Sequence, residues 1–229
     1  MMENGLLAAL SEADRASLDP HLELVELDVK QPLFNSYEPI EYVHFFLSGL
    51  SSEIAGSGRA QIEVGCVGRE GFSGHSVILD VEASPHYAFM QGRGTALRIR
   101  SDLLRQLVDQ RATLRRMLLR FSHVFTTQIA QTALADGRFT LQQRLARWIL
   151  MCQDRVGNTM PLTHEFLALM LGVRRPGVTT TLHILEGEHL IKAERASITV
   201  LNRAGLIETA AGSYGLPEQE YRRLINSAF

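Results

Sequence analysis

The chain has 229 residues, of which 45% are hydrophobic and 21% charged, and its formal net charge is −2. This composition is that of a globular protein with room for two domains. No apolar run reaches the ~18 residues of a transmembrane helix, and the first residues lack the pattern of a secretory signal. Cys66 and Cys152 lie far apart, which excludes a disulfide framework and a cysteine-rich metal site. We expect both thiols to be reduced, in the cytoplasm.

The first element in chain order is an amphipathic helix, expected over residues 5–18 and ended by Pro20. From about 21 to 100, short apolar or alternating runs are separated by glycine-rich turns, which predicts a small β-sandwich or β-barrel. The predicted strands are 22–29, 42–49, 62–68, 87–92 and 96–100. Ser101 and Asp102 can cap the short helix that follows.

Helical periodicity dominates the rest of the chain. A long helix is predicted from about 111 to 136, where apolar residues recur at three- and four-residue steps until Gly137 ends the helix. We expect opposite sides of this helix to pack on the β-domain and on the same helix of a second chain. Further helices are predicted at 140–155, 163–171, 175–188 and 217–226, with a β-hairpin around Glu194–Ala196. Lys and Arg outnumber Asp and Glu only after residue 136, which places a nucleic-acid contact in the C-terminal part.

Residues 162–185 have the pattern of a helix-turn-helix. Thr163 can cap the first helix, Gly172 can adopt the left-handed conformation at its end, and Pro176 suits the first turn of the second helix. The residues expected to face inward are Leu167, Ala168 and Leu171 on the first helix and Val178, Leu182 and Leu185 on the second. A helix, a glycine turn and a second helix with a basic first turn form the arrangement that reads the major groove, and the later hairpin is the expected wing.

The outward side of the second helix carries side chains that can contact DNA. Arg175 can make a bidentate pair with guanine, whereas Arg174 at the helix N-terminus favours phosphate. The predicted DNA-binding residues are Thr163, His164, Arg174, Arg175, Pro176, Thr179, Thr180 and His183. The alternative is a helical hairpin with solvent-exposed arginines, which the order and spacing of the caps, the glycine and the hairpin disfavour.

Several segments resemble the Crp/Fnr superfamily of bacterial transcription regulators. The likeness is carried by RLARWILMCQDRVG (144–157), LTHEFLALMLGVRRPGV (162–178), ITVLNRAGL (198–206), EPIEYVHFFLSGLSSEI (38–54) and VGREGFSGHSVIL (67–79). The resemblance implies an α+β fold. Its expected parts are a double-stranded, jelly-roll-like β-roll of the cyclic-nucleotide-binding type (1–110), a dimerisation helix (111–137) and a winged helix-turn-helix (138–229). It also implies a homodimer formed through the 111–136 helix, double-stranded DNA as partner, RNA polymerase as a further candidate partner, and no membrane contact.

The sequence also departs from the family pattern. The resemblance puts Arg175 and Thr180 at base-reading positions. Cyclic-AMP-dependent members carry glutamate where Pro176 stands and a second arginine where Thr180 stands, so a different operator is expected.

In the β-roll, cyclic-nucleotide binders carry Gly-Glu and, further along, Arg-Ser or Arg-Thr, where this chain has Gly74-His75 and Pro85-His86. A buried phosphate without a cation is costly. We therefore expect an effector other than cyclic AMP in the usual mode. The predicted effector pocket comprises Gly71, Gly74, His75 and His86, and the identity of the effector stays open.

Functions other than DNA binding have less support in the sequence. The N-terminal cysteine cluster of the family's iron–sulfur members is absent, so no such cofactor is expected. His44, His75 and His86 are available to haem or a metal, but a single histidine in a β-roll is more often structural, and no metal site is predicted. An enzyme has least support, because the segment 71–75 lacks the spacing of a nucleophile elbow and there is no phosphate loop. The remaining alternative is a ligand or gas sensor whose β-roll signals to a protein partner rather than to DNA.

Overall fold

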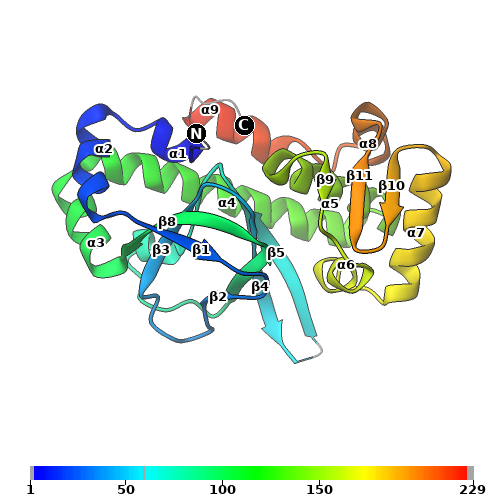
Figure 1. Cartoon of the computed structure of the whole chain (residues 1–229), viewed down its shortest axis with the longest axis horizontal. Helices are drawn as coiled ribbons and strands as arrows, with labels where there is room; N and C mark the ends of the chain where they lie inside the picture. The colour runs from blue at the N-terminus through cyan, green and yellow to red at the C-terminus, as the bar shows by residue number, and fades with distance from the viewer. Residues whose placement is uncertain (1–2, 59, 226–229) are drawn as a thin grey trace.

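The structure is a computed structural model that describes residues 3–58 and 60–225. A long helix, α4 (Ala112–Arg138), runs behind an N-terminal β-domain toward a C-terminal helical domain, and the two domains lie side by side (Figure 1). Within the described ranges, no helix is long and apolar enough to cross a membrane.

The β-domain consists of two four-stranded antiparallel sheets, with strand orders β1-β8-β3-β6 and β2-β7-β4-β5. The strands are β1 (Glu23–Leu27), β2 (Pro32–Phe34), β3 (Tyr42–Phe46), β4 (Leu50–Ser57), β5 (Ala60–Val67), β6 (Phe72–Ser73), β7 (Tyr87–Gly92) and β8 (Gly94–Arg100). All five predicted strands are present, whereas β2, β4 and β6 were not predicted. The first half of β4 is polar yet buried, with Ser51, Ser52 and Glu53 all at most 5% exposed, so its sequence lacks the alternation that marks a half-buried strand.

The helices at the edges of the β-domain correct two predictions. The single helix expected over 5–18 is two helices, α1 (Gly5–Ala8) and α2 (Glu12–Leu18), because the Ser11 side chain accepts a hydrogen bond from the Asp14 backbone and starts a new helix. A short 3-10 helix, η1 (Asp19–His21), follows. The expected cap at residues 101–102 is wrong: α3 (Ser101–Gln110) has Arg100 as its N-cap, without a side-chain cap.

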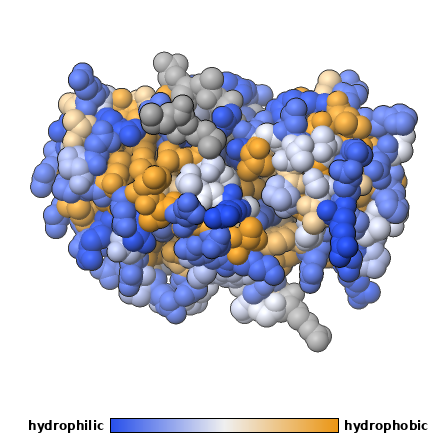
Figure 2. Space-filling model, viewed as in Figure 1, coloured by the Kyte–Doolittle hydropathy of each residue, from blue (hydrophilic) through white to orange (hydrophobic). Residues whose placement is uncertain are grey.

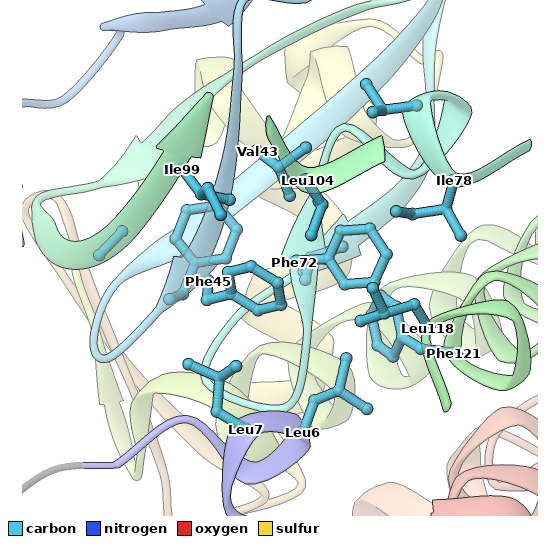
Figure 3. Close-up of a cluster of buried hydrophobic side chains, with 14 of the residues drawn as sticks. Leu6, Leu7, Val43, Phe45, Phe72, Ile78, Ile99, Leu104, Leu118 and Phe121 are labelled. Carbon is cyan, nitrogen blue, oxygen red and sulfur yellow. The ribbon is translucent and has the colours of Figure 1, made fainter. Parts of the chain in front are cut away.

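The helix α4 also extends past its expected end. It continues through Gly137 to Arg138, since a solvent-exposed glycine weakens a helix without breaking it. Its inner face lies on the β-domain, where the Gln128 amide accepts from the Cys66 backbone N–H (2.7 Å) and donates to the Cys66 carbonyl (3.2 Å). Side chains from α1, both sheets, α3 and α4 fill the core between them, among them Leu6, Phe45, Phe72 and Phe121 (Figure 3).

The C-terminal domain consists of α5 (Leu141–Val156), β9 (Thr159–Met160), α6 (His164–Met170), α7 (Arg175–Gly187), β10 (Ile191–Glu194), β11 (Ser197–Val200), α8 (Arg203–Thr209) and α9 (Leu216–Ile225). The predicted hairpin is β10–β11; β9 joins it as a third strand, and neither β9 nor α8 was predicted. Asn226, the end of the helix expected over 217–226, lies outside the described residues. The last helix turns back to α4, where Tyr221 and Ile225 join the core of the N-terminal domain.

The two domains share a second core. Leu50, Ile54 and Phe89 of the β-domain belong to the same buried cluster as Trp148 and Leu182 of the C-terminal domain. The helix-turn-helix is therefore packed against the β-domain.

Candidate nucleic-acid interface

The helix-turn-helix is built from local signals that the sequence contains. The Thr163 hydroxyl accepts from the Phe166 backbone N–H at 3.2 Å and caps α6. Gly172 has a φ of +59°, a left-handed conformation that suits the end of a helix, and the next N–H, of Val173, donates to the Ala168 carbonyl at 3.0 Å. Pro176 lies in the first turn of α7, where its missing N–H costs no hydrogen bond. These predictions are confirmed.

The inner face of α7 anchors the helix in the core. Val178, Leu182 and Leu185 are each 0% exposed, as predicted. Thr181, which was not predicted to be inside, is also buried, because its hydroxyl donates to the Gly177 carbonyl (2.8 Å) and so needs no water. Four inward positions leave the opposite face of the helix free to carry polar groups.

Two of the predicted contact residues hold α6 and α7 together. The Nδ1 atom of His164 lies 2.9 Å from the hydroxyl of Thr179, which also donates to the Arg175 carbonyl at 3.2 Å. Both side chains are partly buried. They fix the angle between the two helices and so position the residues around them.

The other predicted side chains face outward. The exposed residues at the start and along the outer face of α7 are Arg174, Arg175, Pro176, Thr180 and His183. Within the described chain, neither Arg174 nor Arg175 lies within 4 Å of a carboxylate, whereas the exposed Arg93, Arg100 and Arg223 each do. Two unpaired guanidinium groups therefore stand at the N-terminus of the helix, where backbone N–H groups add partial positive charge.

The wing adds a residue that sequence reasoning missed. Arg195 is exposed at the tip of the β10–β11 hairpin, next to Ala196, whose φ is +59°. Hydrophilic side chains gather over this hairpin (Figure 2). The turn itself was predicted, and the arginine within it was the signal in the sequence that could have singled out Arg195.

The predicted effector residues lie in the β-domain, and two of them converge. The buried carboxylate of Glu53 on β4 lies 3.0 Å from Nδ1 of His86 and 3.6 Å from Nδ1 of His75. The His75 ring packs on Phe125 of α4, with ring centroids 4.3 Å apart. Glu53 was missed because nothing local distinguishes a buried acid from an exposed one.

Two further members of the predicted pocket are glycines with backbone roles. A Cβ at Gly71 would lie 1.8 Å from the Phe121 ring, so this glycine lets β6 approach α4. Gly74 has a φ of +93° and precedes the short helix η2 (His75–Leu79). His44, on β3, is in the same sheet as β6, whereas Glu53 is on β4 of the other sheet.

The charges around Glu53 do not favour an anion. Burial lowers the pKa of His75, whereas the hydrogen bond to Glu53 raises the pKa of His86. Burial thus disfavours the protonated form of His75, whereas the hydrogen bond to Glu53 favours the protonated form of His86. In the described part of the chain, no three His, Cys, Asp or Glu side chains are arranged to hold a metal ion.

Two buried polar contacts join the β-domain to α5. The indole N–H of Trp148 donates to the Glu63 carboxyl group at 2.8 Å, and Nε of Arg155 donates to Glu70 at 2.7 Å. Burial raises the pKa of Glu63 to about 7. Neither contact could be predicted, because the partners are far apart in sequence.

Comparison with known proteins agrees with this geometry. Residues 143–209 match the family model of the Crp-like helix-turn-helix domain. A search of curated proteins finds no sequence match.

Solved structures with a similar fold include a chain from Eubacterium rectale assigned to the Crp/Fnr family of transcriptional regulators (17% identity, 90% of this chain and 98% of that chain, TM-score 0.69). FixK2 from Bradyrhizobium japonicum is similar over 82% of this chain and 96% of its own (17% identity, TM-score 0.69). The c-di-GMP-responsive regulator CLP from Xanthomonas campestris is similar over 83% and 99% (15% identity, TM-score 0.66). At these identities the likeness concerns the fold. The chain thus has the fold of these structures and contains a Crp-like helix-turn-helix domain at residues 143–209.

Proposed function

We propose that this protein is a sequence-specific DNA-binding transcription regulator that acts as a homodimer. The observation that carries the proposal is the first turn of α7, where Arg174 and Arg175 are exposed and unpaired on a helix whose opposite face is fully buried. Such a helix presents cations to the major groove without moving the core.

The residues around Arg175 define how DNA would be read. Arg175 is placed to make a bidentate pair with O6 and N7 of guanine, while Arg174 meets a phosphate. Pro176 has no N–H to donate, and Thr180 is too short to replace an arginine. We infer that each half-site has one strongly read guanine, with weaker preferences beside it.

The outer face of α4 supports the homodimer. Residues that alternate at four- and three-residue steps are all exposed: Ala112, Arg116, Leu119, His123, Thr126, Ala130, Ala133 and Gly137. This is the spacing of the seam of a two-stranded coiled coil. The small residues of its second half let two helices approach closely, and a two-fold axis there would present two α7 helices to successive major grooves, ~34 Å apart.

The site around Glu53 supports an effector other than a cyclic nucleotide held in the usual mode. A cyclic phosphate placed between His75 and His86 would face the Glu53 carboxylate, and like charges at short range repel. The test is equilibrium binding of fluorescent cyclic AMP to the wild type and to Glu53→Gln. Tight binding to the wild type would refute this part of the proposal.

Selection of bound duplexes from a random DNA pool tests the central claim. We expect a near-palindromic site, with affinity that falls steeply as salt rises. Arg175→Ala should lower affinity by about 1–3 kcal/mol and remove the preference at one base pair of each half-site, whereas the matched variant Arg174→Ala should weaken all sequences alike. Weak binding that ignores both sequence and salt would contradict the proposal.

A further inference from the structure

The face of α4 away from the β-domain contains a basic groove next to α9. This groove has a volume of about 550 Å³ and is lined by Ala112, Arg115, Arg116, Leu119, Arg120, His123, Arg223 and Leu224. Four of the eight residues are arginines and none is acidic. We call it the α4–α9 groove.

The arginines of the α4–α9 groove differ in their partners. Arg223 makes two hydrogen bonds to Glu220, at 2.9 and 2.7 Å, and Arg120 donates to the Leu224 carbonyl at 3.1 Å. Arg115 and Arg116 have no carboxylate within 4 Å among residues 3–58 and 60–225. Two of the four arginines, Arg120 and Arg223, are thus held by groups of α9, and the other two, Arg115 and Arg116, have no carboxylate partner among the described residues.

Because the α4–α9 groove lies on the proposed dimer face, its positive charges would meet their copies in the second chain. Arg116, Leu119 and His123 belong to the exposed seven-residue pattern of α4. In a parallel pair of helices related by a two-fold axis, each of these residues meets its own copy. Arg116 would then face the same arginine of the second chain, and these like charges oppose closure of this half of the helix pair.

We propose that the α4–α9 groove, together with its copy in the second chain, binds a polyphosphate anion that closes the first half of the helix pair. The proposal rests on the homodimer proposed above. Guanidinium groups bind phosphate oxygens in a bidentate manner, and two facing grooves supply enough cations for a multiply charged ligand. Leu119 and Leu224 add apolar surface, so the anion can be free polyphosphate or the polyphosphate part of a nucleotide.

Sedimentation velocity of the full chain tests this, with pyrophosphate, ATP, phosphate or sodium chloride added at matched ionic strength. We expect pyrophosphate to tighten dimerisation at least tenfold more than sodium chloride does. Tighter dimerisation with ATP than with pyrophosphate would identify the anion as a nucleotide. Equal tightening by ATP and pyrophosphate would identify it as free polyphosphate. In the absence of any added anion, Arg116→Gln should dimerise more tightly than the wild type. Added pyrophosphate should not tighten its dimerisation further. The matched variant Arg69→Gln, on the β-domain surface, should behave as the wild type.

The outcomes separate the two proposals. A constitutive dimer without a pyrophosphate effect, or a response that Arg116→Gln retains, overturns the anion site and leaves the homodimer intact. A chain that stays monomeric in every condition, while Ala130→Glu has no effect on DNA binding, overturns the homodimer and the anion site together.

Discussion

The ion pair between Glu70 and Arg155 offers a quantitative test of how the two domains are joined. Both residues are 5% exposed, and Nε of Arg155 donates to Glu70 at 2.7 Å. The second oxygen of Glu70 accepts from the Gly68 N–H at 3.0 Å, and Arg155 also donates to the Met151 carbonyl at 2.7 Å. The pair connects the loop after β5 to α5, so it lies across the domain boundary.

Removing one partner should destabilise the protein strongly, because the other charge stays buried. We expect Glu70→Gln and Arg155→Met each to lower the free energy of unfolding by about 3–5 kcal/mol. For a chain of this length that corresponds to a fall in Tm of roughly 6–20 °C. The double variant Glu70→Gln/Arg155→Met removes both charges of the pair, so its loss should be much smaller than the sum of the two single losses.

Thermal and urea unfolding, followed by circular dichroism at pH 7, measure this cycle. Glu194→Gln is the matched control, because it breaks the exposed pair with Lys192 and should leave the free energy of unfolding nearly unchanged. A loss for Glu70→Gln no larger than that for this control, or a double-variant loss equal to the sum of the two single losses, would contradict a strongly coupled buried pair.

Two further predictions concern positions where the structure shows close packing or buried charge. Gly71→Ala should destabilise by at least about 1–3 kcal/mol in urea unfolding, because its Cβ would lie 1.8 Å from the buried Phe121 ring. Gly137→Ala, where no atom lies within 4 Å, should instead stabilise by about 0.5–1 kcal/mol, and equal effects of the two changes would contradict this account. The pH prediction concerns Glu63, because burial raises its pKa from 4.5 to about 7 in the folded protein. The stability contributed by its protonated form is therefore present below pH 4.5 and is lost as pH rises through 7. Glu63→Gln should flatten the pH dependence of Tm between these values, and an unchanged slope would show that Glu63 ionises normally.

Much of the fold could be predicted because its signals are local. The caps and turn of the helix-turn-helix depend on residues within a few positions of each other, as Thr163 with Phe166 and Gly172 with α6 show. The errors also have local reasons. Ser11 starts a second helix within the first predicted one, and Gly137 does not end α4 because it lies on an exposed helix face.

The order of the predicted strands and helices, the periodicity of α4 and the basic first turn of α7 could be inferred from the amino-acid sequence, since each depends on neighbours along the chain. Which distant residues meet depends on the tertiary structure. It placed Glu53 between His75 and His86, and it folded α9 back onto α4. A buried polar residue has the same local sequence as an exposed one, and its partner is set by how sheets and helices pack.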